Sequence, residues 1–177
     1  KVGNKPSSLQ IASMIKRVYP ILKKEKPNIV LVEGDTNTVL AGSLVSSQLR
    51  IPIGHVEAGL RSYDKNMPEE VNRTIADHLS DSLFASTNIS KNNLLKENIK
   101  KNKIFITGNT IVDSIYENQK RLHKSSILDR LKLNKKNYFL LTIHRVENVE
   151  NGAKLVNIFK GLSVVYNEFK MPIVFPI

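Results

Sequence analysis

Short apolar runs alternate with amphipathic segments along most of this 177-residue chain. The clearest run, Ile29 to Val32, has no polar interruption, which is typical of a strand covered on both faces. A helix-like segment follows it over residues 36–48, and the same succession of strand, loop and helix recurs along the sequence. Such repeats predict an α/β fold in which helices lie on both faces of a parallel sheet.

The expected elements follow one another closely. We expect helices over residues 8–24, 36–48, 68–79, 90–99, 111–122 and 153–168, and strands over 29–32, 51–56, 82–86, 104–107, 138–143 and 173–177. Pro20 should kink or interrupt the first helix, and Ser90 should cap the fourth. A lysine-rich connector, residues 124–136, should separate a first domain, residues 1–123, from the beginning of a second, residues 137–177.

Both ends look incomplete for such a sheet, because the sequence begins in a helix-like segment and stops inside an apolar strand. A parallel edge strand needs a following crossover to cover it. We therefore expect the chain to be a piece of a larger protein.

The net charge of +11 is unevenly spread. Residues 33–81 contain eight acidic and four basic side chains, a net charge of −4, while the rest contains 23 basic and 8 acidic ones, a net charge of +15. The lysines have no interleaved aromatic residues, which favours a solvated surface over a nucleic-acid interface. No apolar run reaches the ~18 residues of a membrane helix, and the lack of cysteine excludes disulfides. We expect a cytoplasmic protein that binds neither nucleic acid nor membranes.

Three carboxylates lie where an α/β sheet binds ligands, beyond the carboxyl ends of its strands. Asp35 follows the first predicted strand and Glu57 ends the second. As an alternative, Asp35 could cap the next helix. Glu57 follows an apolar strand and is costly to bury without a partner, so the two form a candidate acid–base couple. Glu69 lies in the first turn of a helix, where the helix dipole alone would explain an acidic residue.

A second polar group follows the apolar segment 139–143. His144 and Arg145 could hold a phosphate there, although an ion pair between Arg145 and Glu147 in a surface loop would also explain the charges. No glycine-rich dinucleotide fingerprint or P-loop occurs, and the four histidines lack metal-ligand spacing. We expect neither a cofactor nor a metal.

Five short motifs now stand in order along the chain. They are Gly34-Asp35-Thr36-Asn37-Thr38, His55-Val56-Glu57-Ala58-Gly59-Leu60-Arg61, Pro68-Glu69-Glu70-Val71-Asn72-Arg73, Thr107-Gly108-Asn109-Thr110-Ile111-Val112-Asp113 and His144-Arg145-Val146-Glu147-Asn148. Together they closely resemble the non-hydrolysing UDP-N-acetylglucosamine 2-epimerases. This resemblance covers essentially the whole chain and implies a GT-B-like fold, with two Rossmann-like domains and a UDP-sugar in the cleft between them.

The resemblance implies interconversion of UDP-N-acetylglucosamine and UDP-N-acetylmannosamine, which feeds surface polysaccharide synthesis. UDP is eliminated to leave a 2-acetamidoglucal, and re-addition with C2 protonated from the other face gives the epimer. Carried over motif by motif, the catalytic candidates are Asp35, Glu57, Glu69 and His144, and the substrate-binding candidates are Arg61, Asn109, Arg145 and Glu147. Which carboxylate serves which face stays open. Arg145 and Glu147 are also candidates for an allosteric response, and a homodimer is expected.

The chain departs from the family pattern at both ends. The N-terminal strand with its basic nucleotide-binding loop is missing, as is most of the second domain, and the loop between Arg61 and Pro68 is short. We therefore expect little or no epimerase activity from these residues alone. The alternatives are a GT-B glycosyltransferase, a hydrolysing epimerase, or an inactive UDP-sugar-binding fragment.

Overall fold

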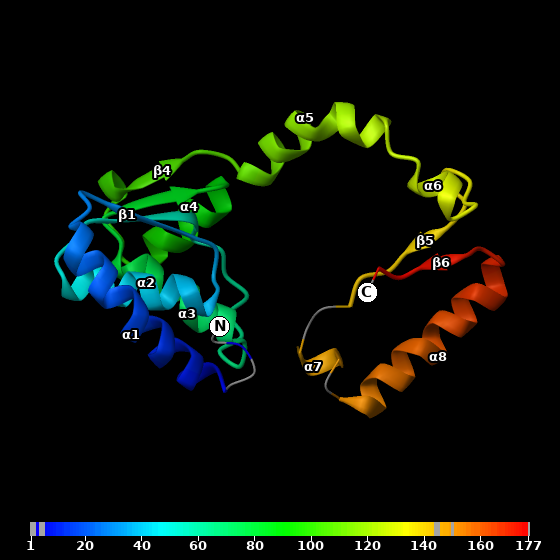
Figure 1. Ribbon diagram of the computed structural model, residues 1–177, viewed down its shortest axis with the longest axis horizontal. Helices are drawn as coiled ribbons and strands as arrows, with labels where there is room; N and C mark the ends of the chain where they lie inside the picture. Colours follow the sequence, from blue (N-terminus) through cyan, green and yellow to red (C-terminus); the bar gives the residue numbers. More distant parts are fainter. Residues whose placement is uncertain (1–2, 4–5, 144–145, 150, 177) are drawn as a thin grey trace. The chain divides into compact units, whose positions relative to one another are not determined.

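The computed structural model describes residues 3, 6–143, 146–149 and 151–176. The chain divides into two compact units, Lys1–Tyr116 and Glu117–Ile177, which are shown in Figure 1. The division falls within helix α5 (Thr110–His123). The expected domain limits, with a connector over residues 124–136, stay a prediction.

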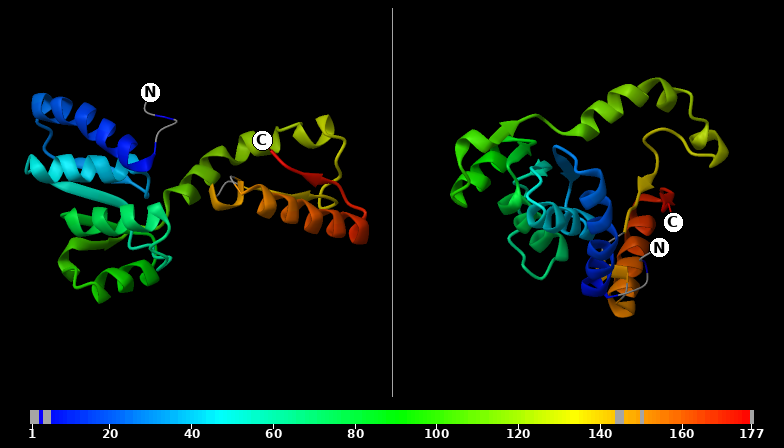
Figure 2. Two further views of the ribbon diagram at one scale, coloured as in Figure 1. Left: turned by 90° about the horizontal axis from the view of Figure 1, so that it is seen from below. Right: turned by 60° about the vertical axis from the view of Figure 1, so that its left-hand side comes forward.

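The first unit is built on a parallel sheet. Its strands are β1 (Val30–Glu33), β2 (Ile53–Ala58), β3 (Ser82–Ala85) and β4 (Ile104–Ile106), and they lie in that order across the sheet. The helices between them are α2 (Asn37–Gln48), α3 (Pro68–Leu79) and α4 (Asn88–Lys96), with a short 3₁₀ turn, η1 (Lys101–Lys103), before β4. Helix α1 (Ser7–Glu25) packs on α2 (Figures 1 and 2). The predicted parallel α/β fold is confirmed.

The core of the first unit lies on one face of the sheet. Val32 and Ile53 pack there with Val39 of α2 and Ala76 of α3. A second buried cluster joins the sheet to α4 and consists of Ala58, Leu83, Ala85, Leu94 and Ile104. These contacts place the carboxyl ends of β1 and β2 beside the first turns of α2 and α3, so loops from both strands are close to helix termini.

The opposite face of the sheet is left uncovered by the described residues of the first unit. Successive strand residues point to opposite faces, so Leu31 lies on the side away from Val32. Leu31 is 63% exposed and Phe105 is 48% exposed, and the ring centroids of Phe84 and Phe105 are 5.9 Å apart. Within the first unit, the prediction of helices on both faces of the sheet is therefore wrong.

Two local predictions also differ from the structure. Helix α1 runs through Pro20 without ending, so the predicted break into two pieces is wrong, while the alternative of a kink stays a prediction. Helix α4 is capped by Thr87, whose side-chain oxygen accepts a hydrogen bond from the backbone N–H of Ser90 at 3.1 Å. The predicted cap, Ser90, instead lies inside the helix. A threonine at this position satisfies an N–H group that the first turn leaves unpaired.

The second unit contains one parallel βαβ arrangement. Strands β5 (Phe139–Leu140) and β6 (Ile173–Val174) pair in parallel, and helix α8 (Gly152–Phe169) connects them. Two short helices, α6 (Ile127–Arg130) and α7 (Val146–Val149), precede α8. Both strands are shorter than predicted. Among the described residues, no helix combines the length and apolar character needed to cross a membrane.

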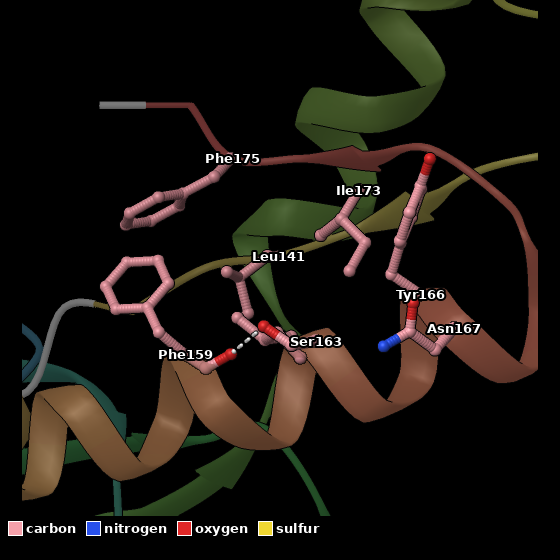
Figure 3. Close-up of a pocket in the computed structure, with 8 residues that line it drawn as sticks. Leu141, Phe159, Ser163, Tyr166, Asn167, Ile173 and Phe175 are labelled. Atoms are coloured by element: carbon pink, nitrogen blue, oxygen red, sulfur yellow. Dashed lines mark hydrogen bonds between the residues drawn. The ribbon is translucent and has the colours of Figure 1, made fainter.

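A space of about 470 Å³ lies between α8 and the two strands of the second unit. Figure 3 shows the apolar side chains around it, including Phe159 and Phe175, whose ring centroids are 6.5 Å apart. The Ser163 hydroxyl donates a hydrogen bond to the carbonyl oxygen of Phe159 within the same helix (3.0 Å). Because no charged side chain among the described residues lines this space, those residues supply no acid–base pair there.

Candidate active site

Glu57 has an unusual backbone conformation at the carboxyl end of β2. Its φ is +66°, and the pairing of β2 with β3 is irregular between Val56 and Ala58. Among the described non-glycine residues with positive φ, Glu57 alone lies inside a strand. This conformation costs roughly 1–2 kcal/mol in an L-residue. Bulges of this kind redirect side chains beside active sites, so the strain marks Glu57 as a functional candidate.

Three of the five motifs meet around the Glu57 side chain. Its Oε1 accepts a hydrogen bond from Asn109 Nδ2 (3.2 Å), and the Oδ1 of the same asparagine accepts one from the backbone N–H of Ile111 (2.9 Å). On the other side, a Cβ atom built on Gly34 would lie 3.8 Å from Glu57 Oε2. Gly34 has φ +78°, a conformation that glycine adopts without strain. The structure thus brings Asn109 and the Gly34 loop to the same carboxylate.

Asp35 is held by helix α3. Its carboxylate forms an ion pair with Arg73, and its carbonyl oxygen accepts a hydrogen bond from Asn72 Nδ2 (2.9 Å). The N-cap residue of α2 is Thr36, which makes no side-chain capping bond. The alternative interpretation of Asp35 as a helix cap is therefore wrong. The pair with Arg73 stabilises an ionised Asp35 next to the Gly34 turn.

Glu70 anchors the loop that follows β2. Its carboxylate accepts hydrogen bonds from the backbone N–H groups of Ser62 and Tyr63 (both 2.9 Å) and pairs with Arg73 (3.1 Å). Burial raises the pKa of Glu70, but the backbone hydrogen bonds from Ser62 and Tyr63 outweigh it and leave the pKa below its ordinary value. Glu70 thus has a structural role, and the first turns of α3 hold both loops of the site.

Glu69 differs from its neighbour. It is exposed in the first turn of α3, and no hydrogen bond or ion pair engages it within the described part of the chain. The structure therefore brings Asp35 and Glu57 to the same loop but joins Glu69 to neither through a described contact. The convergence of all three carboxylates on one sugar ring stays a prediction.

Arg61 lies inside the first unit, where its side chain is 2% exposed. It donates hydrogen bonds to both carboxylate oxygens of Glu97 (2.6 and 2.7 Å), to Asp77 Oδ2 (2.7 Å) and to the carbonyl oxygen of Leu60 (2.6 Å). Burial lowers the pKa of Arg61, but the hydrogen bond to Glu97 and the charge of Asp77 raise it above its ordinary value. This geometry supports a structural role for Arg61, and its implied contact with the substrate stays a prediction.

Asp77 is the centre of this buried cluster. Its Oδ1 is 2.7 Å from His55 Nδ1, and its Oδ2 accepts hydrogen bonds from Arg61 and from the backbone N–H of Gly59 (3.1 Å). Arg61 links this cluster to Glu97. The hydrogen bond that Arg61 donates lowers the pKa of Glu97, and this effect outweighs the opposite effect of burial.

Sequence reasoning gave no role to Asp77 or Glu97. One signal was available for Asp77, because Glu70, Arg73 and Asp77 recur at helical spacing on one face of α3.

The chain matches the family model described as UDP-N-acetylglucosamine 2-epimerase over residues 2–177. It belongs to this family. It is 49% identical to the UDP-N-acetylglucosamine 2-epimerase of Methanocaldococcus jannaschii, and the match covers 99% of this chain and 49% of the relative. A crystal structure of the M. jannaschii UDP-GlcNAc 2-epimerase in complex with UDP-GlcNAc and UDP superposes with a TM-score of 0.90 at 48% identity, over 99% of this chain and 49% of that one.

A more distant relative is the UDP-2,3-diacetamido-2,3-dideoxy-D-glucuronate 2-epimerase of Pseudomonas aeruginosa. It is 37% identical over 93% of this chain and 46% of the relative. The chain spans about half the length of the curated relatives it matches. These comparisons confirm the family resemblance and the GT-B-like α/β fold class.

Several predicted site residues cannot be placed in this epimerase-family chain. His144 and Arg145 lie outside the described residues, and so does the side chain of Glu147, although its backbone belongs to α7. Their roles in holding the nucleotide stay predictions. Across residues 3, 6–143, 146–149 and 151–176, no group of three histidine, aspartate or glutamate side chains is arranged to hold a metal ion. The described site is therefore built from carboxylates, an amide and their supporting arginines.

Proposed function

We propose that the protein interconverts UDP-N-acetylglucosamine and UDP-N-acetylmannosamine without hydrolysing them. The observation that carries this proposal is the strained Glu57, whose Oε2 faces the Gly34 turn while Asn109 occupies its Oε1. Half-buried carboxylates with one unengaged oxygen suit proton transfer. The family match over residues 2–177 supports the choice of reaction.

The reaction breaks the bond between C1 and the UDP oxygen and the C2–H bond, and it forms a C1=C2 double bond. Re-addition of UDP reverses both changes, with the proton returned to the opposite face of C2, so nothing is oxidised overall. No carbonyl group acidifies C2, so cleavage of the C1–O bond must lead and positive charge develops on the ring. An ionised Asp35, held by Arg73, would stabilise that charge.

Proton transfer at the two faces of C2 falls to the remaining carboxylates. Glu57 supplies an oxygen that is not hydrogen-bonded to Asn109, and Glu69 is exposed at the start of α3. One of them accepts the C2 proton on its own face, and the other donates a proton to C2 on the opposite face. Which of the two serves which face is left to experiment. His144 and Arg145 complete the proposal on the nucleotide side.

The substrate class is a UDP-linked 2-acetamido sugar. The M. jannaschii relative is named for UDP-N-acetylglucosamine and the P. aeruginosa relative for a diacetamido uronate, and both names place the epimerisation at C2. The higher identity of the first favours UDP-N-acetylglucosamine. We also propose a cytoplasmic homodimer that serves polysaccharide synthesis and needs no cofactor, as the family resemblance implies.

Hydrogen exchange at C2 tests the proposal directly. The full-length gene product is incubated with UDP-N-acetylglucosamine in D₂O, and the nucleotide sugars are analysed by NMR and mass spectrometry. We expect both epimers, intact and with deuterium at C2. Release of free N-acetylmannosamine would instead indicate hydrolysis, and turnover only with an added acceptor would indicate a glycosyltransferase. Retention of the original C2 hydrogen in every product would contradict the proposal.

A matched pair of variants tests the role of Glu57. Glu57→Gln removes the base while preserving shape, and we expect kcat to fall by about 10²–10⁴-fold. Glu25→Gln changes an exposed glutamate of α1 and should leave kcat unchanged. For residues 1–177 alone we predict little or no turnover, and calorimetry with UDP and with UDP-N-acetylglucosamine would separate binding from inertness.

A further inference from the structure

His55 lies fully buried in β2 with an oxygen atom at each of its ring nitrogens. Nδ1 is 2.7 Å from Asp77 Oδ1 of α3, and Nε2 is 2.8 Å from the carbonyl oxygen of Gly34 at the end of β1. Both distances are those of good hydrogen bonds. A neutral imidazole has only one N–H group and could donate to only one of these two oxygens.

The two acceptors settle where the protons must be. The Gly34 carbonyl oxygen can only accept a hydrogen bond, so Nε2 carries a hydrogen. Asp77 could supply the second bond only if it were protonated, but its carboxylate also accepts hydrogen bonds from Arg61 (2.7 Å) and from the N–H of Gly59 (3.1 Å). These donors favour the ionised carboxylate. Nδ1 therefore carries the other hydrogen, and the ring is an imidazolium.

The surrounding charges agree with a cationic ring. Asp77 and Glu97 contribute two negative charges to the cluster, and Arg61 contributes one positive charge. An imidazolium at His55 balances the charges of these four side chains, of which His55, Arg61 and Asp77 are buried and Glu97 is 26% exposed, and charges held out of water need such partners. His78 pairs with the outer side of Glu97 but is 47% exposed, so its charge is screened by solvent.

His55 also connects the buried cluster to the site carboxylates. The carbonyl it binds belongs to Gly34, which precedes Asp35 and whose missing side chain would point at Glu57 Oε2. Glu57 itself lies two residues after His55 in the same strand. A shift of the Gly34 carbonyl would move the Asp35 backbone and change the space in front of Glu57.

We propose that His55 is a positioning residue of the epimerase site that donates a hydrogen bond from each ring nitrogen, which fixes the Gly34 turn to Asp77 and so sets the separation of Asp35 and Glu57. This inference rests on the proposed function for its catalytic consequence, but the charge state of His55 does not. His55 is thereby assigned no proton-transfer role, because both of its nitrogens are engaged as donors.

NMR of the full-length gene product labelled with ¹⁵N-histidine tests the charge state without any activity. At neutral pH we expect the two ring nitrogens of His55 to show the shifts and N–H couplings of an imidazolium. The signals are assigned by correlating the ring with the backbone amide of His55, so no variant is needed. A ring nitrogen without a proton at that pH would overturn the proposal, whatever the activity of the protein.

Kinetics of two variants test the positioning role. His55→Gln can donate to only one of the two oxygens, so we expect kcat to fall by about 10–100-fold while KM changes little, since displacement of reacting groups by about 1 Å costs about this much. His78→Gln, the matched control at the exposed end of the cluster, should keep both parameters. An unchanged kcat in folded His55→Gln would refute positioning. If that variant fails to fold, the NMR result on the unmodified protein decides.

Discussion

Two groups of charged side chains lie in the first unit and differ in how completely they are paired. In the buried cluster of His55, Arg61, Asp77 and Glu97, the oxygens of Asp77 and Glu97 all have donors. At the rim of the sheet, Glu57 has a donor at one oxygen, and exposed Glu69 has no described partner. Burial explains the first pattern, because charges removed from water need partners.

The same short motifs supply both groups. In the segment from His55 to Arg61, Glu57 lies at the rim of the sheet, whereas His55 and Arg61 belong to the buried cluster. The segment from Pro68 to Arg73 likewise gives Glu69 to the rim, while Glu70 and Arg73 support the loops. Each of these motifs therefore combines proposed reacting groups with the groups that hold them, and the two kinds differ in how completely they are paired.

Arg61→Met should have the largest effect on stability. It leaves Asp77 buried and Glu97 partly buried with too few partners, and breaking a buried pair costs about 3–5 kcal/mol. Chemical denaturation of the variant measures the change in free energy of unfolding. Arg121→Met on the exposed surface of α5 is the matched control and should change it by less than about 1 kcal/mol. Equal effects of the two substitutions would contradict the contrast between cluster and surface.

Gly59→Ala should be the next most damaging change. Gly59 has φ +82°, and an added Cβ would lie 2.3 Å from the carbonyl oxygen of Ser90. The left-handed backbone and the overlap together should cost about 2–5 kcal/mol. The comparison variant is Gly161→Ala inside α8, where an added Cβ meets nothing within 4 Å. It should raise helix stability by up to about 1 kcal/mol. Thermal melts of both variants would show opposite signs.

Glu97→Gln tests the pH dependence of the cluster. The pKa of Glu97 is below its ordinary value of 4.5, so its contribution to stability is present above about that pH and is lost as the pH falls through the lower folded-state pKa. At neutral pH the variant should lose about 1–3 kcal/mol. The difference from the unmodified protein should shrink below pH 4.5. A difference independent of pH down to full protonation of the carboxylates would contradict the ionic contribution.

Glu57→Gly should have the smallest effect on stability. It should stabilise the protein, whereas the three substitutions in the cluster and at Gly59 should destabilise it. Glycine relieves the strain at φ +66°, so the free energy of unfolding should rise by about 0.5–1 kcal/mol, although the proposed activity is lost. Glu33→Gly in β1, which has no positive φ, is the control and should lower stability by a similar amount. Destabilisation by both substitutions would indicate that Glu57 is held mainly by its contacts, as the cluster residues are.

The sequence predicted the order of elements well because its local signals agree. Helix α3 occupies its predicted residues, 68–79, since Pro68 suits a first helical position. Asp35 and Glu57 were found because the ends of strands are where ligands bind.

The buried cluster was not predicted, because Arg61 and His55 lie 16 and 22 residues from Asp77, and only packing of β2 against α3 brings them together. Nor does local sequence reveal a left-handed glutamate inside a strand.

The hydrogen bond from Asn109 makes the two oxygens of Glu57 chemically inequivalent. Oε1 accepts a hydrogen bond from the side-chain amide of Asn109. Oε2 instead faces the position that a Cβ atom would occupy if residue 34 were not glycine. Because Gly34 has no side chain, Oε2 of Glu57 is accessible from the side of the Gly34 turn. In the proposed reaction, a carboxylate held in this way would present only one oxygen to C2 of the glucal intermediate, from a direction that the fold fixes before the substrate binds.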